Sequence, residues 1–226
     1  PDLPGHGKSA KPENFDYSLP GFAKIIIQLL DQLGVQKAHI VGLSFGGAIS
    51  SYIAIYYPER EDRLVLSDSA GTKNPAIKPL SFLATPLTIR LTGVTSARRY
   101  RGLSNKQRAR AEMSASFRNT QEELPYLKAI DRTLTQLSKI DLTDELSKIQ
   151  AKTLIIWGKD DSLLPTHYSK VFLKNIANSE LYIVKNGGHT PNMRKPKEFN
   201  CALKNFLKDI SLEECIASPI VKDKIK

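Results

Sequence analysis

The chain has few cysteines, no long hydrophobic run and no visible signal-peptide pattern. Its 226 residues include two cysteines, Cys201 and Cys215. Two cysteines do not form the disulfide framework of a small secreted domain, so we expect free thiols in a reducing compartment, the cytoplasm. No apolar run approaches the roughly 20 residues that span a bilayer, and no signal-peptide pattern is visible, so no membrane partner is expected.

Metal and nucleotide motifs are also missing. The sequence has no C-x-x-C, H-E-x-x-H or acidic calcium-loop pattern, so neither a metal nor a cofactor is predicted. Gly7-Lys8-Ser9 resembles the end of a phosphate-binding loop, but Asp2 stands where that loop needs its first glycine. We therefore do not expect an NTPase.

Positive charge is abundant and unevenly distributed. The formal net charge is +10, and residues 71–144 hold 13 Lys and Arg against 6 Asp and Glu, an excess of +7. Tyr100 is the only aromatic residue between Arg98 and Arg110, whereas nucleic-acid-binding surfaces interleave aromatic and basic residues. The basic region is typical of a solvated helix face, and steering of anionic substrates is its functional alternative. The expected partner is a small-molecule substrate, not a nucleic acid.

The pentad Gly42-Leu43-Ser44-Phe45-Gly46 is the first strong indication of function. It follows an apolar run at 38–41 and precedes a helix-compatible segment at 48–57. In the context strand, G-x-S-x-G, helix, the serine lies on a strained turn and acts as a nucleophile. The two glycines let neighbouring backbones approach closely, and the Phe45 N–H is the expected oxyanion donor.

Two later strand-like runs also end in polar residues. Residues 153–157 are followed by Gly158-Lys159-Asp160-Asp161, and residues 181–184 lead to Asn186-Gly187-Gly188-His189. Serine, acid and histidine, in this order along the chain, is the order of the catalytic triad in α/β-hydrolases. Three such parts at three strand ends are far more specific than the pentad alone.

With these motifs, the chain resembles the α/β-hydrolase-fold family from residue 1 to about residue 210. The segment from Asp2 to Ser9 is similar to the D-x-P-G-x-G-x-S loop of that family. Residues 158–161 match its G-x-x-D acid loop, and residues 187–189 resemble its G-x-G-H histidine loop, with Asn186 in place of the first glycine. The segment Arg194-Lys195-Pro196 stands where family members often carry an acidic residue before the proline.

The resemblance implies an α/β fold, with a mostly parallel sheet flanked by helices and an inserted helical cap. It also implies that the first strands, and the loop with the second oxyanion donor, precede Pro1. We expect the hydrolase core at 1–70 and 145–226, and the cap or lid at 71–144. Apolar spacing predicts helices over 22–33 and 124–137, and strands over 38–43, 63–67, 153–157 and 181–184.

The predicted catalytic residues are Ser44 as nucleophile, His189 as general base and Asp161 as the acid that orients His189. Asp160 and Asp68 are alternatives for the acid, because Asp160 is adjacent and Asp68 ends the strand after the pentad. The other histidines are weaker candidates, and the second of them is expected to pack within its strand: His6, His39 and His167.

These residues predict a serine hydrolase that cleaves a carboxylic ester or a related acyl bond of a small molecule. A serine nucleophile argues against the dehalogenase and epoxide-hydrolase branches, which resemble this chain but use aspartate. One alternative is a C–C bond hydrolase acting on a diketone-type ring-cleavage product. A non-catalytic binding member of the fold is the other. The sequence does not indicate the oligomeric state.

Overall fold

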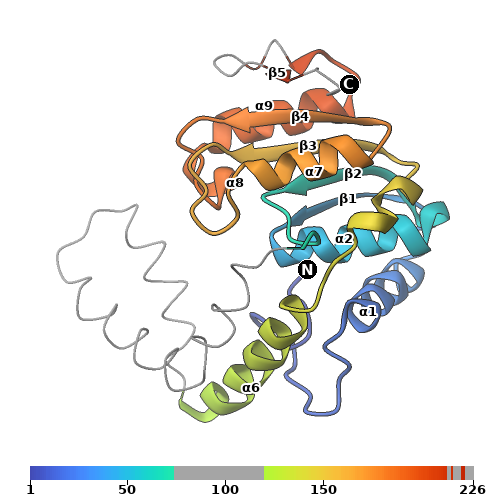
Figure 1. Cartoon of the computed structure of the whole chain (residues 1–226). Helices are drawn as coiled ribbons and strands as arrows, with labels where there is room; N and C mark the ends of the chain where they lie inside the picture. Colours follow the sequence, from blue (N-terminus) through green and yellow to red (C-terminus); the bar gives the residue numbers. More distant parts are fainter. Residues whose placement is uncertain (74–119, 213–214, 216–219, 222–226) are drawn as a thin grey trace. The chain divides into compact units, whose positions relative to one another are not determined.

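A computed structural model describes residues 1–73, 120–212, 215 and 220–221 (Figure 1). The chain forms two compact units, one of Pro1–Phe22 and Asn74–Lys139, the other of Ala23–Lys73 and Ile140–Lys226. Most of the cap predicted at 71–144 falls on residues 74–119, which lie outside the described residues. The division into core and cap therefore stays a prediction.

The second unit contains the sheet. Among the described residues it has five strands, in the order β1-β2-β3-β4-β5. Strands β1 (Ala38–Leu43), β2 (Glu61–Ser67), β3 (Lys152–Gly158) and β4 (Ser179–Val184) pair in parallel, and β5 (Ile220–Val221) pairs antiparallel with β4. The four predicted strands are confirmed. The short β5 carries no sequence signal that we recognised.

Helices alternate with these strands, as expected for parallel crossovers. Helix α1 ends at a left-handed glycine, Gly34 with φ 68°, which is the predicted stop signal. The helices that precede, separate or follow these strands are α1 (Leu19–Gln32), α2 (Phe45–Tyr56), α7 (His167–Asn175), α8 (Pro191–Arg194) and α9 (Pro196–Leu207). Two 3₁₀ turns, η1 (Pro58–Arg60) and η2 (Thr143–Lys148), accompany them. Of the helices that the structure describes, none is long and apolar enough to cross a membrane.

The core explains why the strands read as continuous apolar runs. Successive residues Leu64, Val65 and Leu66 of β2 are all fully buried, so both faces of the strand are covered. On one face, side chains of β2, β3 and β4 pack against α9: Val65, Leu154, Ile156, Tyr182, Val184, Phe199, Ala202 and Phe206. This packing fixes the carboxyl ends of the strands relative to one another.

The first unit contains α6 (Thr120–Leu137) and the opening segment of the chain. The helix predicted from the apolar spacing at 124–137 is confirmed. Lys128 Nζ lies 2.7 Å from Glu13 Oε1, and the Arg132 guanidinium stands 5.7 Å from the centre of the Tyr17 ring. These contacts hold part of the predicted cap against the segment that precedes α1.

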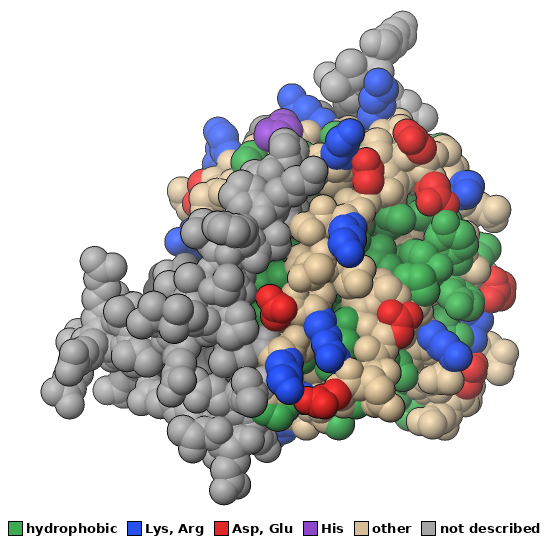
Figure 2. Space-filling model, turned by 60° about the horizontal axis from the view of Figure 1, so that its bottom comes forward, with side chains coloured by type: hydrophobic (Ala, Val, Ile, Leu, Met, Phe, Trp, Pro, Cys, Tyr) green, Lys and Arg blue, Asp and Glu red, His purple; other side chains and the backbone are tan. Residues whose placement is uncertain are grey.

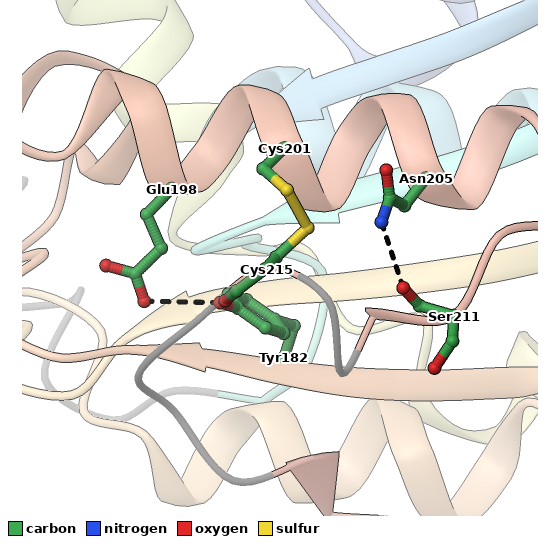
Figure 3. Close-up of a disulfide and its surroundings, with 6 residues drawn as sticks. All are labelled: Tyr182, Glu198, Cys201, Asn205, Ser211 and Cys215. Atoms are coloured by element: carbon green, nitrogen blue, oxygen red, sulfur yellow. Dashed lines mark hydrogen bonds between the residues drawn. A yellow bond between two sulfur atoms is a disulfide. The ribbon is translucent and has the colours of Figure 1, made fainter.

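The two cysteines form a disulfide, so the prediction of free thiols is wrong (Figure 3). Cys201 lies on α9 and Cys215 on the segment that follows it, with their Cα atoms 5.6 Å apart. The Tyr182 hydroxyl of β4 donates a hydrogen bond to the Cys215 carbonyl. The error arose because two lone cysteines 14 positions apart give no sign of spatial proximity, and the pair gives no support to a reducing compartment.

His39 does not pack within its strand, which corrects a second prediction. Its side chain is 40% exposed, and Nδ1 lies 3.2 Å from Asp62 Oδ2. In the part of the sheet that the structure describes, β1 has β2 on one side only. Val41, two residues further along, is exposed in the same way. Because successive side chains of a strand point to opposite faces, His39 and Val41 lie together on the exposed face of β1.

On the face shown in Figure 2, charged side chains of both signs are interspersed around an area of hydrophobic side chains. Several of the basic residues have acidic partners. Asp209, just after α9, lies 2.6 Å from the Arg63 guanidinium and 2.7 Å from Lys152 Nζ. In the second unit, part of the positive charge is thus balanced locally.

Candidate active site

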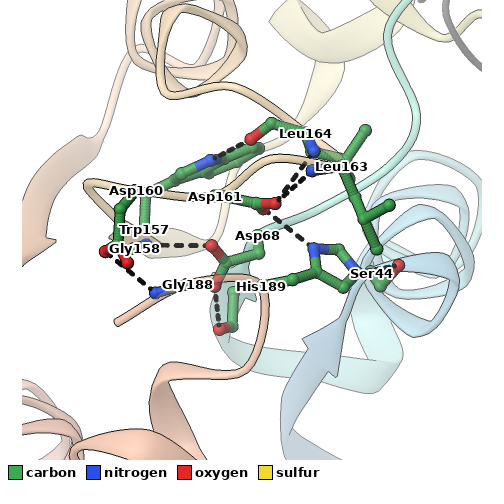
Figure 4. A network of polar contacts seen from close by, with 11 residues as sticks. Ser44, Asp68, Trp157, Gly158, Asp160, Asp161, Leu163, Leu164, Gly188 and His189 are labelled. Atoms are coloured by element: carbon green, nitrogen blue, oxygen red, sulfur yellow. Dashed lines mark hydrogen bonds and ion pairs between the residues drawn. The ribbon is translucent and has the colours of Figure 1, made fainter. Parts of the chain in front are cut away.

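Four polar residues follow the carboxyl ends of four neighbouring strands (Figure 4). Ser44 follows β1, Asp68 follows β2, Asp161 lies beyond β3 and His189 lies beyond β4. Because these strands are parallel, their carboxyl ends share one edge of the sheet, which is where ligands bind in open α/β sheets. All four residues belong to the second unit.

Ser44 occupies a strained turn between β1 and α2. Its φ is 54° and its ψ is −117°, a backbone conformation that costs a non-glycine residue on the order of 1–3 kcal/mol. Two backbone hydrogen bonds to β2 and the turn after it fix this conformation. Ser44 N–H donates to Ser67 O at 2.9 Å, and Ala70 N–H donates to Ser44 O at 2.9 Å. The geometry is that of the predicted strand-to-helix elbow.

The glycines of the pentad differ in their reason for being there. A Cβ on Gly42 would lie 2.4 Å from both Gly46 O and Ser50 Oγ, so this position requires glycine. A Cβ on Gly46 would meet no described atom within 4 Å, so the close approach expected there is wrong. It occurs one residue later, where a Cβ on Gly47 would lie 2.1 Å from Ser69 Oγ.

A chain of hydrogen bonds connects Ser44, His189 and Asp161. Ser44 Oγ is 3.0 Å from His189 Nε2, and His189 Nδ1 is 2.8 Å from Asp161 Oδ2. An ionised carboxylate can only accept hydrogen bonds, so the proton of the neutral ring lies on Nδ1. In that tautomer Nε2 accepts the hydrogen bond from the Ser44 hydroxyl.

Asp161 is buried but well supplied with donors. Its side chain has no exposed surface, whereas that of His189 is 21% exposed. The Asp161 Oδ1 atom accepts hydrogen bonds from the N–H groups of Leu163 at 2.8 Å and Leu164 at 3.0 Å. Burial raises the pKa of Asp161, but the bonds from His189 and these two N–H groups outweigh it and hold the pKa below its usual value. Asp161 is therefore ionised near neutral pH.

Asp160, the adjacent alternative, has different partners. Its Oδ1 accepts a hydrogen bond from Gly188 N–H at 3.1 Å, and its Oδ2 lies 3.3 Å from Arg194 Nη1. The structure thus brings Asp161, not Asp160, to the His189 ring. Arg194, which departs from the family pattern, faces an acid supplied by the acid loop itself.

Asp68, the other alternative, is fully buried beside this hydrogen-bonded chain. Its Oδ1 accepts a hydrogen bond from Gly158 N–H at 2.9 Å, and its Oδ2 accepts one from the Ser67 hydroxyl at 3.0 Å. The sequence indicated Asp68 as an alternative acid for His189, but not as a second carboxylate beside Asp161. The sequence signal for Asp68 was its position directly after β2, which lies between β1 and β3 in the sheet.

Other predicted residues lie elsewhere or remain untested. His6 belongs to the first unit, where Nδ1 is 3.1 Å from Pro4 O, and His167 begins α7. Phe45 is the first residue of α2, and its role as oxyanion donor stays a prediction. Among the described residues, one group could offer ligand atoms to a metal, Asp68, Asp161 and His189, with those atoms within 4.8 Å of one another. Hydrogen bonds account for this grouping, and we assign no metal to it.

Comparison with known proteins gives one family. The sequence profile described as "alpha/beta hydrolase fold" matches residues 1–196. The chain is 31% identical over 213 residues to 2-hydroxymuconate semialdehyde hydrolase of Pseudomonas putida, covering 92% of this chain and 75% of that protein. It is 27% identical over 224 residues to monoacylglycerol lipase ABHD6 of Mus musculus, covering 92% of this chain and 67% of that protein.

A solved structure is similar along most of the chain. It is that of a hydrolase from Pseudomonas aeruginosa PA01, with a TM-score of 0.75 and 25% sequence identity. The similarity covers 91% of this chain and 77% of that one.

Proposed function

Because the chain belongs to the alpha/beta hydrolase fold family, we propose that it hydrolyses a small-molecule substrate at a carbonyl carbon, with Ser44 as the nucleophile. His189 is the general base, and Asp161 orients the His189 ring. The observation that carries this proposal is the continuous contact from Ser44 Oγ to His189 Nε2 at 3.0 Å and from His189 Nδ1 to Asp161 Oδ2 at 2.8 Å.

The proposed mechanism follows from these contacts. His189 Nε2 takes the proton of Ser44 as the hydroxyl oxygen attacks the carbonyl carbon, and the ring becomes positively charged. Asp161 keeps the ring in its orientation and stabilises that charge. The oxyanion forms at the N-terminus of α2, where the Phe45 N–H donates to it. His189 then returns the proton to the leaving group, and water releases the acyl group by the same route.

Two classes of substrate fit this mechanism. An ester or related acyl substrate is the broadest, and the similarity to the mouse protein named as a monoacylglycerol lipase supports it. Cleavage of a C–C bond beside a carbonyl is the second. The similarity to 2-hydroxymuconate semialdehyde hydrolase, which is the stronger match of the two at 31% identity, favours this second class. In that reaction the leaving group is a carbon, and the proton must be delivered to it.

A paired assay separates the two classes. The purified protein is given p-nitrophenyl esters of increasing acyl length and, separately, a 2-hydroxy-6-oxo-dienoate, and release of each product is followed by absorbance. Greater kcat/KM for the dienoate identifies a C–C hydrolase, and greater kcat/KM for the esters identifies an esterase. Ser44→Ala should lower whichever activity is found by a factor of about 10⁴ or more if the three residues act as a unit.

A covalent probe tests the nucleophile independently of the substrate. A fluorophosphonate should label the protein once, on the peptide that contains Ser44, and Ser44→Ala should abolish the labelling. Labelling that survives this substitution contradicts the proposed function.

A further inference from the structure

A second buried carboxyl group, that of Asp68, lies next to the proposed catalytic residues and has no part in the mechanism above. Asp68 has a φ of 41°, a left-handed backbone conformation that is uncommon outside glycine. Its N–H donates to Ile156 O of β3 at 3.0 Å, which fixes the turn to the neighbouring strand. The residue is fully buried. An ionisable group held in this way, without solvent, needs an explanation.

The side chain of Asp68 reaches the loop that carries Asp161. Its Oδ1 accepts a hydrogen bond at 2.9 Å from Gly158 N–H, at the end of β3 (Figure 4). A Cβ on Gly158 would lie 1.9 Å from Gly188 O, so the acid loop and the histidine loop are in close backbone contact at this point. Through its hydrogen bond to Gly158, Asp68 therefore fixes the backbone at the point where the acid loop contacts the histidine loop.

The charge of Asp68 also faces the proposed catalytic residues. Its carboxylate, a carboxylate oxygen of Asp161 and a ring nitrogen of His189 all lie within 4.8 Å of one another. Among the described residues, Asp161 and His189 are the charged or titratable groups that act on it. Burial raises the pKa of Asp68 to about 7, against the hydrogen bonds from Gly158 and Ser67, which lower it. Asp68 therefore keeps its proton to higher pH than an ordinary aspartate does.

We propose that Asp68 is a positioning residue for the reaction, which fixes the acid loop through Gly158 and, when ionised, stabilises the protonated ring of His189. This inference rests on the proposed function. No bond to Asp68 forms or breaks in the reaction. As the pH rises, Asp68 gives its proton to solvent. The proton of Ser44 still moves to His189 Nε2, and the second nearby negative charge makes that transfer more favourable.

The variant that tests the proposal is Asp68→Asn. Asparagine keeps an oxygen that can accept from Gly158 N–H, but it cannot ionise. We expect the ratio of wild-type kcat to variant kcat to stay within about twofold near pH 5.5 and to reach about tenfold near pH 9, because only ionised Asp68 supplies the charge. The midpoint of this change should follow the pKa of Asp68, which burial raises to about 7.

Ser67→Ala provides a second and milder test. The Ser67 hydroxyl donates to Asp68 Oδ2 and favours its ionised form. Removing it should raise the pKa of Asp68 and move the corresponding step in the pH profile of kcat to higher pH. Asp62→Asn is the matched control, because Asp62 lies on the same strand but is exposed and faces His39. It should leave the profile unchanged.

The outcomes separate the two proposals. A loss in Asp68→Asn that is equal at every pH would reduce the residue to a structural support, and no loss at any pH would remove it from the reaction. If Asp68→Asn does not fold, a Ser67→Ala profile identical to that of the wild type overturns the inference. A Ser44→Ala variant that stays active instead overturns the proposed function itself.

Discussion

The Gly188 N–H donates a hydrogen bond to Asp160 Oδ1 at 3.1 Å. This contact joins the acid loop to the residue directly before His189, and the Arg194 side chain pairs with the other oxygen of the same carboxylate. Gly188 has a φ of 56°, and a Cβ there would lie 2.3 Å from Arg194 Nη1. Asp160 and Asp161 thus act on the same histidine loop in two ways, one on its backbone and one on the ring.

This difference predicts unequal effects for two adjacent substitutions. Asp161→Asn should lower kcat by roughly 10³ to 10⁴, because the ring of His189 loses its correct tautomer. Asp160→Asn should cost less than about tenfold, because asparagine still offers an oxygen to Gly188 N–H and the lost ion pair is exposed. Steady-state kinetics on the folded variants measures both losses in kcat. Asp160→Ala is added because it removes the oxygen that accepts from Gly188 N–H. A larger loss in Asp160→Asn than in Asp161→Asn would show that the acid is wrongly assigned.

Glu61 predicts a pH-dependent stability. The side chain is 2% exposed, neither oxygen has a hydrogen-bond partner among the described atoms, and burial raises its pKa to about 8. Since the folded pKa lies above that of the unfolded chain, its contribution to the free energy of unfolding is fully present below about pH 4.5 and is lost as the pH rises toward 8. Glu61→Gln should flatten this fall, which is on the order of several kcal/mol.

Urea unfolding at several pH values tests this prediction. The variant should match the wild type near pH 5 within about 1 kcal/mol and be more stable near pH 8. Asp62→Asn, at the next position but exposed, is the control and should leave the slope unaltered. Parallel curves for the wild type and Glu61→Gln would mean that Glu61 does not titrate in this range.

The disulfide predicts a loss of stability without a loss of activity. It closes a loop of 14 positions between Cys201 and Cys215, and cross-links of that size contribute about 3 kcal/mol. The double variant Cys201→Ser and Cys215→Ser should lose about 2–3 kcal/mol, because its unfolded chain is no longer constrained by the cross-link. Thermal unfolding with and without dithiothreitol measures it, and reductant should shift only the wild-type curve. The kcat should be unchanged, and a loss comparable to that of Asp161→Asn would contradict this separation.

The basic segment at 71–144 predicts a salt effect. If it forms a lid that controls substrate entry, its excess of +7 should attract anionic substrates. The kcat/KM for an anionic ester should then fall steeply between low and high ionic strength, while that for a neutral ester of similar size changes little. Equal responses of the two esters would reduce the charge to a solubility feature. Substitutions in this segment should alter KM and substrate preference more than the reactivity of Ser44 toward a fluorophosphonate.

Local patterns in the sequence predicted most of the elements. The runs at 64–66 in β2 and 154–157 in β3 are apolar because both faces of these strands are covered, and each ends at a polar residue or a glycine. The left-handed Gly34 ends α1 as a glycine after an amphipathic run should. Ser44, Asp161 and His189 could be singled out because each follows its own strand in a motif of fixed spacing.

The contacts that the sequence did not reveal join different elements of the fold. Asp68 and Asp161 are 93 positions apart, yet their carboxylates are neighbours because β2 and β3 are paired in register. The disulfide joins α9 to the segment that follows it, and the close approach at Gly47 depends on Ser69 of the turn after β2. The motifs alone determined which residue types stand at the strand ends, because turns and strands are specified locally. Only the tertiary structure decided which carboxylate reaches His189 and which supports the loops, because strand pairing and core packing set those distances.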